Sequence, residues 1–179
     1  MATVNNTRFV ILGLLSLSDK SGYDIKKEVS SQMDHFWSES YGKIYPMLRM
    51  LEKEKAIEKE VEKSDGKPDR YVYHLTKTGE KQLKDWMKTD IVSLRGRNEL
   101  LLRLYLGKNT SKNVLINHVK DAKKRREEDL EFYTGMKQKL NASKDDHTPY
   151  HLITVEYELA HSKSYIGWCK EALKELERM

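Results

Sequence analysis

The spacing of the apolar residues changes from helical to alternating after Ile57, and this change constrains the fold more than any other feature of the sequence. Residues 57–61 and residues 71–75 each alternate between apolar and polar side chains, as half-buried strands do. Between them, residues 64–69 read Ser-Asp-Gly-Lys-Pro-Asp, a composition that favours a turn. The sequence therefore predicts a β-hairpin within a chain whose other patterns are helical.

Three helical segments precede this hairpin. Residues 5–18 are mostly apolar, and Ser21 with Asp24 has the spacing of a capping box at the start of a second helix. A third helix is expected to begin near Tyr41–Lys43, and Thr76 is expected to cap a further helix after the hairpin. Three helices followed by a hairpin of this length are the plan of a winged helix-turn-helix domain.

Pro46 indicates which end of the third helix is presented. Proline lacks an N–H, so it is expected in or near the first turn, where N–H groups have no helical acceptor. The first turns then display two aromatic and two basic side chains, Tyr41, Lys43, Tyr45 and Arg49. No acidic residue occurs over 41–50. Because the third helix of such a domain inserts its N-terminal part into the major groove, we predict a DNA-reading face here. The alternative is an ordinary solvated helix face.

The second half of the chain predicts long helices. Residues 97–107 are rich in leucine, Asn109 or Thr110 is expected to cap a helix to about Leu140, and Thr148–Pro149 is expected to start the last helix. Spacings of three and four along the last helix form a heptad seam, made by Leu152, Val155, Leu159, Ser162, Ile166, Cys169, Leu173 and Leu176. A seam of this kind needs a partner helix. We predict a homodimer through Leu101, Leu104, Leu152, Leu159, Ile166 and Leu173. An intrachain three-helix bundle without a dimer is the alternative.

The predicted fold is therefore mainly α with a small β-hairpin, in two domains. Residues 1–90 are expected to form a winged helix-turn-helix DNA-binding domain, and residues 91–179 a helical dimerisation and ligand-sensing domain. The net charge of +5 permits an acidic partner without showing one. Cys169 is the single cysteine, which excludes an internal disulfide and a cysteine metal cluster.

Several other functions are not expected. The apolar run 9–17 is too short to span a bilayer, so we expect a cytoplasmic protein without membrane contact. No glycine-rich phosphate loop or nucleophile constellation stands out, so no enzyme and no cofactor are predicted. His147 and His151 lie four residues apart, but Thr148–Pro149 starts a helix between them, and no metal site is predicted.

The motifs resemble those of the PadR family of bacterial transcriptional regulators over nearly the whole chain. They are "ILGLLSLSDKSGYDI" with "IYPMLRMLE", then "GKPDRYVYHLTKTGEKQL". The segment "HLITVEYELAHSKSYIGW" resembles the subfamily of phenolic-acid-responsive repressors. The resemblance implies a homodimer on a near-palindromic operator, usually repressing, with a ligand that releases DNA in some members. One departure is visible, because the family usually has a glycine where Lys55–Ala56 ends the recognition helix. A left-handed residue there would be strained.

The pattern and the resemblance together give a candidate DNA-binding set: Ser21, Tyr23, Ser40, Tyr41, Lys43, Tyr45, Pro46, Arg49, Lys67 and Arg70. For Lys67 and Arg70 the alternative is a charged hairpin tip, because Asp65 and Asp69 dilute the positive field. The basic run 123–126 is instead expected to pair with Glu127 and Glu128 at i,i+4.

A site for a small aromatic effector is also predicted. Its side chains are Phe36, Trp37, Tyr105, His151 and Trp168, with Arg103 as a carboxylate partner. By the resemblance, His151 stands where the phenolic-acid repressors place a ligand-site histidine. The alternative is that these aromatic residues are interdomain core. A second class of function stays open, namely a winged helix that binds protein without sequence-specific DNA binding.

Overall fold

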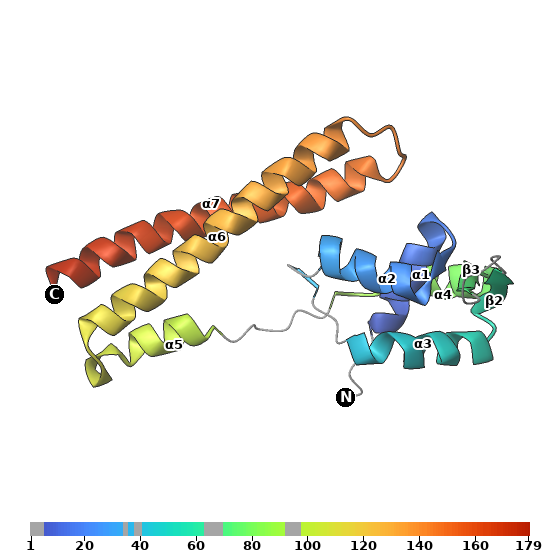
Figure 1. Ribbon diagram of the computed structural model, residues 1–179, viewed down its shortest axis with the longest axis horizontal. Coiled ribbons are helices and arrows are strands. Elements are labelled where there is room, and N and C mark those ends of the chain that lie inside the picture. Colours follow the sequence, from blue (N-terminus) through green and yellow to red (C-terminus); the bar gives the residue numbers. More distant parts are fainter. Residues whose placement is uncertain (1–5, 34–35, 38–40, 63–69, 92–97) are drawn as a thin grey trace. The chain divides into compact units, whose positions relative to one another are not determined.

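The computed structural model describes residues 6–33, 36–37, 41–62, 70–91 and 98–179. The chain divides into two compact units, Met1–Ser93 and Leu94–Met179. Figure 1 shows the elements of each unit along the chain. Most of the described residues are helical, and the strands form one small antiparallel sheet. The predicted fold class, mainly α with a small β-hairpin, is confirmed.

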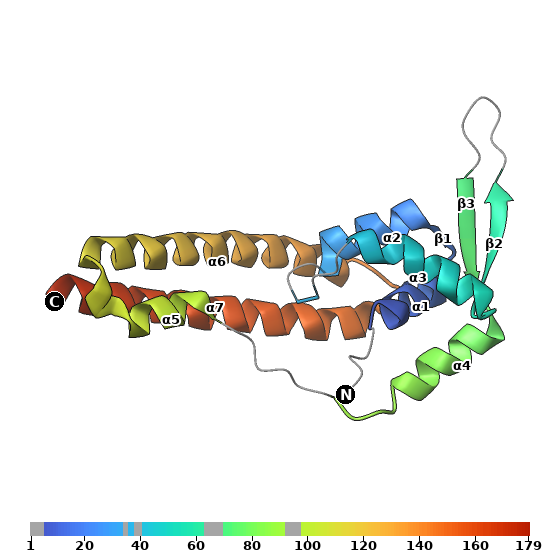
Figure 2. The ribbon, with the colours of Figure 1, turned by 90° about the horizontal axis from the view of Figure 1, so that it is seen from below.

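The described residues of the first unit form four α-helices, a π-helical turn and three strands. In chain order they are α1 (Thr7–Leu17), β1 (Lys20–Ser21), α2 (Gly22–Glu28), the π-helical turn (Val29–Met33), α3 (Tyr41–Lys53), β2 (Ile57–Glu62), β3 (Arg70–Leu75) and α4 (Lys77–Trp86). The strand order is β1-β3-β2, with β3 antiparallel to both neighbours. Figure 2 shows β2 and β3 projecting as a hairpin beyond the helices of this unit. The predicted turn 64–69 lies outside the described residues.

The register of the hairpin brings the predicted faces of the two strands together. Ile57 pairs with Leu75 and Lys59 with Tyr73, so the alternating positions share one face of the sheet. The two-residue strand β1 was not predicted, because two residues are too few to show a period. The capping box at Ser21 is present, since its side chain accepts from the Asp24 N–H and Asp24 accepts from the Ser21 N–H.

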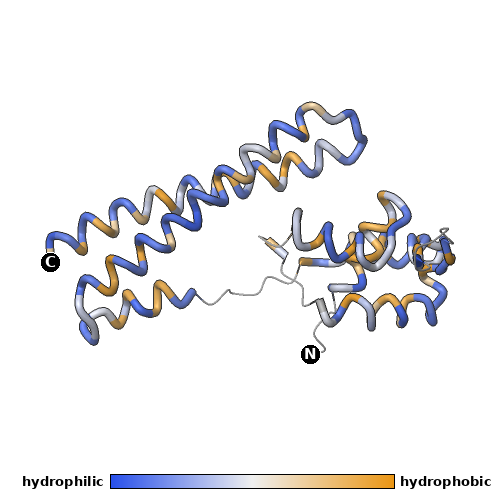
Figure 3. The backbone as a smooth tube through the Cα atoms, viewed as in Figure 1, coloured by the Kyte–Doolittle hydropathy of each residue, from blue (hydrophilic) through white to orange (hydrophobic). Residues whose placement is uncertain are grey.

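The core of the first unit lies between α1, α2, α3 and the base of the sheet. Its buried members include Ile11 and Leu12 from α1, Ile25 from α2 and Leu48 from α3, all without exposed surface. Figure 3 shows hydrophobic positions recurring along α3 between hydrophilic ones. Because this stripe faces the core, the opposite side of α3 is left to solvent.

Pro46 lies near the start of α3, as expected. The helix begins at Tyr41, within the predicted range, which places Pro46 in its second turn. The missing N–H leaves the carbonyl of Gly42 without its helical partner. Gly42 and Pro46 are both exposed, so water can satisfy that carbonyl.

The end of α3 is a Schellman motif built on a lysine. The Ala56 N–H donates to the Leu51 carbonyl at 2.9 Å, and the Lys55 N–H donates to the Glu52 carbonyl at 3.0 Å. Lys55 takes the left-handed conformation that this motif requires, with φ of 56°. The strained junction expected at Lys55–Ala56 is therefore present.

Gly79 in α4 packs against this same junction. A Cβ on Gly79 would lie 2.1 Å from the Ala56 carbonyl oxygen, a distance that no side chain could accept. Thr76, the N-cap of α4 as predicted, accepts from the Gly79 N–H at 3.2 Å and donates to the Lys55 carbonyl at 2.8 Å. The Leu-Thr-x-x-Gly motif thus joins the fourth helix to the end of the third.

The second unit is an antiparallel helical hairpin with a short helix at one end. Its elements are α5 (Glu99–Tyr105), a 3₁₀ turn (Gly107–Asn109), α6 (Lys112–Asn141) and α7 (Thr148–Arg178). Helix α5 is shorter than the predicted segment 97–107. The N-cap position of α6 is Ser111, whereas Asn109 or Thr110 was predicted. Helix α7 has His147 at its N-cap position, one residue before the predicted Thr148, and Pro149 lies in its first turn as predicted.

The heptad seam of α7 packs against α6 of the same chain. Val155 and Leu159 meet Tyr133 of α6, while Cys169 and Leu176 meet Leu115 and Val119. Leu104 and Leu173 pack against this second cluster, and Ile166 is buried. Four of the six residues predicted for the dimer, Leu104, Leu159, Ile166 and Leu173, are therefore engaged within the chain, whereas Leu101 is half-exposed and Leu152 partly buried.

Candidate nucleic-acid interface

The outer face of α3 is basic, aromatic and open to solvent. Lys43, Tyr45, Pro46, Arg49 and Met50 are exposed, while Ile44, Met47, Leu48 and Leu51 on the same helix are buried. In the described part of the chain, neither Lys43 nor Arg49 forms an ion pair. Two cations without a carboxylate partner on one exposed helix face can accept phosphate or base-edge acceptors.

The start of α3 adds a favourable field. Its first turn contains no acidic residue, so the partial positive charge of the helix N-terminus is not neutralised locally. Backbone N–H groups at such an end bind phosphate oxygens well. Tyr41 begins the helix, and the predicted contact Ser40 lies outside the described residues.

Helix α2 touches the same face through its first turn. A Cβ on Gly22 would lie 2.7 Å from Cε1 of Tyr45, so the glycine lets the tyrosine ring rest against the start of α2. Tyr23 is 64% exposed beside it. Ser21 is buried, and its hydroxyl donates to Asp24 Oδ2 at 2.7 Å. Tyr23 and Tyr45 are thus placed for contact, whereas Ser21 shapes the backbone.

Arg70 of β3 has a partner within the protein. Its guanidinium forms an ion pair with the Asp24 carboxylate, which also accepts from Ser21. Burial alone would raise the pKa of Asp24, but the hydrogen bonds from Ser21 and Arg70 and the charge of Arg70 outweigh it and lower that pKa. Arg70 therefore ties β3 to the start of α2. Lys67, the other predicted contact of the hairpin, lies outside the described residues.

Sequence reasoning missed a second group of side chains, where the sheet meets α3. Lys59 Nζ lies 3.4 Å from Glu52 Oε1 and 4.9 Å from the centre of the Tyr71 ring. Tyr73, which pairs with Lys59 across the two strands, is buried. Burial raises the pKa of its hydroxyl, Glu52 and Tyr45 raise this pKa further, and Lys59 and Arg49 lower it. The sequence shows Lys59 and Tyr71 only as members of strands, and the position of Lys59 beside Glu52 of α3 depends on the fold.

The predicted effector residues do not gather within one unit. Phe36 and Trp37 belong to the first unit and the other four to the second. His151 and Trp168 both lie on α7, and a helix rises about 1.5 Å per residue, so they are roughly 25 Å apart along its axis. Tyr105 is 88% exposed.

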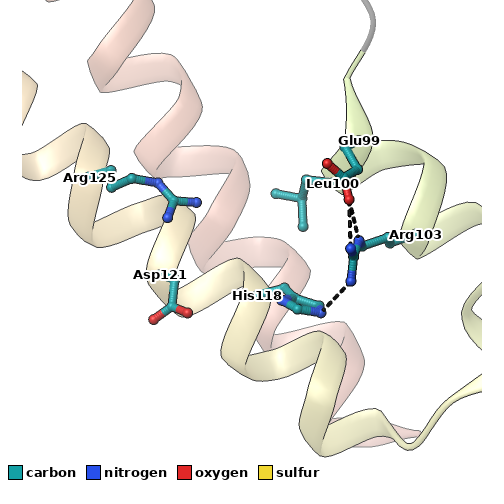
Figure 4. A pocket seen from close by; sticks show the side chains of 6 residues that line it. All are labelled: Glu99, Leu100, Arg103, His118, Asp121 and Arg125. Carbon is teal, nitrogen blue, oxygen red and sulfur yellow. Dashed lines mark hydrogen bonds and ion pairs between the residues drawn. The ribbon is translucent and has the colours of Figure 1, made fainter.

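Arg103 lies at a shallow pocket of the second unit. Figure 4 shows its lining of Glu99, Leu100, Arg103, His118, Asp121 and Arg125, and its volume is about 270 Å³. Arg103 donates to Glu99 Oε1 at 2.6 and 2.9 Å, and its Nη1 lies 3.3 Å from His118 Nε2. The guanidinium is therefore already held by protein partners.

The basic run 123–126 is paired as predicted. Lys123 lies 2.6 Å from Glu127, Lys124 lies 4.0 Å from Glu128, and Arg126 lies 3.0 Å from Asp129. No helix in the described part of the chain is long and apolar enough to cross a membrane. Within the same residues, no group of three or more histidine, cysteine, aspartate or glutamate side chains is arranged to hold a metal.

Comparisons with known proteins agree with this geometry. Residues 11–85 match the family described as transcriptional regulator PadR-like, and residues 96–177 match the virulence activator alpha C-terminal family. The crystal structure of a PadR-like transcriptional regulator from Bacillus cereus is 30% identical, with a TM-score of 0.83 over 96% of this chain and 98% of that one. The chain belongs to the PadR-like family of transcriptional regulators.

A curated PadR-family relative is similar over nearly its whole length. The negative transcriptional regulator PadR of Bacillus subtilis is 27% identical over 96% of this chain and 97% of its own. Its crystal structure with operator DNA has a TM-score of 0.86 at 26% identity, over 97% of this chain and 99% of that one. Its structure with p-coumaric acid, at 24% identity, has a TM-score of 0.76 over 99% of both chains.

Proposed function

We propose that this PadR-like regulator binds operator DNA through the outer face of α3 and the first turn of α2. The observation that carries the proposal is the exposed face of α3 over residues 41–50, which contain no acidic residue and where Lys43 and Arg49 have no carboxylate partner in the described part of the chain. The Bacillus subtilis relative solved with operator DNA supports it. Residues 1–90 then form the DNA-binding domain. The proposed role is that of a cytoplasmic repressor without enzymatic activity.

The side chains divide between reading and positioning. Lys43 and Arg49 are assigned to base edges or phosphates, and Tyr45, Pro46 and Met50 present apolar surface suited to thymine methyl groups. Tyr23 is assigned to a phosphate or sugar contact, because most protein–DNA hydrogen bonds from hydroxyl groups go to the backbone. Ser21 and Arg70 hold α2 and β3 in place around Asp24.

The test is a double substitution, Lys43→Ala with Arg49→Ala. Each base contact contributes about 1–3 kcal/mol, so removal of two is expected to weaken operator binding at least about 30-fold. The operator duplex is recovered by genomic binding-site selection with purified protein, and affinity is measured by fluorescence anisotropy. Lys84→Ala, an exposed lysine of α4, is the control. Unchanged affinity in the double variant contradicts the proposal. Recovery of no duplex at all indicates a protein-binding winged helix.

We further propose a homodimer through residues 91–179, on a face of α7 that the predicted seam does not include. The side of α7 away from α6 carries exposed apolar and small residues at helical spacing: Ile153, Tyr157, Ala160, Ser164, Gly167 and Trp168. Such a stripe on a long helix favours helix packing, because small residues let two backbones approach. A two-fold dimer then fits a near-palindromic operator with half-sites about 34 Å apart.

The proposed effector is a small aromatic acid, in line with the p-coumaric acid bound by the Bacillus subtilis relative. The candidate residues do not form one site within a unit, because Phe36 and Trp37 belong to the first unit and His151 and Trp168 lie far apart on α7. Titration of aromatic acids is followed by tryptophan emission, with and without operator. Saturable quenching that is weakened by DNA and abolished in His151→Ala supports an effector. Quenching that leaves operator affinity unchanged contradicts it, because a ligand with equal affinity for both states shifts nothing.

A further inference from the structure

The two faces of the β2–β3 hairpin differ in charge. Side chains alternate across a strand, so Glu58, Glu60 and Glu62 of β2 share one face and Ile57, Lys59 and Val61 share the other. The first face also carries Arg70 and His74, the cross-strand partners of Glu62 and Glu58. One face is therefore rich in carboxylates, and the other has none on either strand.

The basic side chains of the acidic face already have partners within the protein. His74 lies between two carboxylates, with Nδ1 3.0 Å from Asp19 and Nε2 3.3 Å from Glu60. Arg70 is paired with Asp24. Glu58, Glu60 and Glu62 are all exposed, so this face presents a row of negative charge. Such a face repels the phosphate backbone at short range.

The opposite face continues the surface of α3. Lys59 and Glu52 form an ion pair across the junction of β2 and α3. Tyr45 and Arg49 of α3 lie near enough to Tyr73 to influence its hydroxyl. Val61 and Tyr71, which pair across the strands, are 42% and 51% exposed on this face. The face defined by Lys59, Val61 and Tyr71 is thus contiguous with the exposed face of α3.

We propose that Lys59 and Tyr71 are positioning contacts to the DNA backbone, and that the hairpin meets DNA with this face rather than with Arg70. This inference rests on the proposed function. The Lys59 ammonium and the Tyr71 hydroxyl supply a cation and a donor for phosphate oxygens, beside the base contacts of α3. Charge complementarity selects this face, because the other carries three glutamates. Glu52 holds Lys59 in the free protein and competes with phosphate for it.

The salt dependence of binding tests the assignment. Removal of one phosphate contact is expected to reduce the slope of log affinity against log salt by about 1. Lys59→Gln should therefore lower the slope by about 1 and weaken binding equally for selected and scrambled duplexes. Tyr71→Phe should weaken binding about 2- to 10-fold, as removal of one neutral hydrogen bond does. Glu52→Gln should strengthen binding, because it frees Lys59.

Two matched variants serve as controls on the acidic face. Glu60→Gln makes the same charge change as Glu52→Gln and should leave the affinity near that of the wild type. Arg70→Gln removes a cation next to Tyr71 in sequence, and it should lower the thermal midpoint while leaving the salt slope unchanged. Binding of these variants is measured on the whole 179-residue chain with the duplex recovered by genomic selection.

The outcomes separate this inference from the proposed function. If the Lys43 and Arg49 variant loses binding while Lys59→Gln keeps the wild-type slope, the inference is wrong and the proposed function stands. A reduced slope in Arg70→Gln with an unchanged slope in Lys59→Gln would assign the contact to the other face. If the wild-type protein binds no duplex, both are wrong. A reduced slope in Lys59→Gln alone supports the inference.

Discussion

Lys55 is strained, because it holds a left-handed backbone that favours glycine. Its φ of 56° is the only positive value among the residues other than glycine in the described ranges. The conformation costs an L-residue roughly 1–2 kcal/mol. It is retained because Ala56 is fully buried and both Schellman hydrogen bonds close around it. The strained backbone at Lys55 thus fixes the direction in which β2 leaves α3.

We predict that Lys55→Gly raises the free energy of unfolding by about 1 kcal/mol. Glycine removes the left-handed penalty but adds backbone entropy to the unfolded chain, so the gain is smaller than the full strain. Urea denaturation followed by far-UV circular dichroism measures it. Lys81→Gly in the middle of α4 is the matched control and should lower the free energy by about 1 kcal/mol. A decrease in stability in Lys55→Gly would show that the lysine makes a compensating contact.

Single residues were predictable where their partners lie close in sequence. The capping box of Ser21 and Asp24 and the N-cap Thr76 depend on residues three positions away, and all three are present as predicted. The pairing of Arg70 with Asp24 spans 46 residues and depends on the sheet register. Sequence patterns carry no signal for such a contact, so the structural role of Arg70 and the exposure of Lys59 beside α3 were not predicted.

At the scale of elements, the seam between α6 and α7 contains one polar interruption. Ser162 is fully buried, and its hydroxyl has no hydrogen-bond partner in the described part of the chain. Nearby, Glu158 is also buried, and burial together with this carboxylate raises the pKa of the Tyr133 hydroxyl on α6. A buried polar position of this kind costs stability, and in helical assemblies it can fix the register of two helices.

We predict that Ser162→Ala stabilises the second unit by about 1 kcal/mol, because an unsatisfied buried hydroxyl costs about 1–3 kcal/mol and alanine leaves little void. Thermal unfolding followed at 222 nm measures the change. Thr134→Ala on α6 is the control, since its exposed hydroxyl donates to the Leu130 carbonyl at 2.7 Å and its removal should change little. A drop in stability for Ser162→Ala would mean that an ordered water satisfies the hydroxyl.

The helix spacing predicted the seam but not its partner. Leucine and isoleucine at heptad positions show that a face is buried, and the same pattern arises whether the covering helix belongs to this chain or to another. The structure gives α6 as the covering helix for Leu159 and Cys169. The exposed stripe along α7 was overlooked, because tyrosine, alanine, serine and glycine dilute its hydrophobic pattern.

At the scale of the whole molecule, a glutamate substitution is expected to have opposite effects on the two faces of α7. Ile153 is 68% exposed in the single chain, so Ile153→Glu should leave the α6–α7 hairpin folded. Leu159 is 6% exposed between the two helices, and Leu159→Glu should unfold the hairpin, because a buried charge without a partner is costly. Far-UV circular dichroism distinguishes the two variants.

Ile153→Glu is then the test of the dimer. If the outer face of α7 is the interface, the substitution places a charge of each chain in a buried apolar contact, and the mass by light scattering should fall from twice 21.1 kDa to 21.1 kDa at micromolar concentration. Operator affinity should fall with it, because one half-site contact replaces two. Glu156→Gln, on an exposed glutamate that pairs with Lys137 of α6, should keep the dimer. A folded Ile153→Glu protein that remains dimeric would move the interface elsewhere, and the half-exposed Leu101 and Leu102 of α5 would be the next surface to substitute.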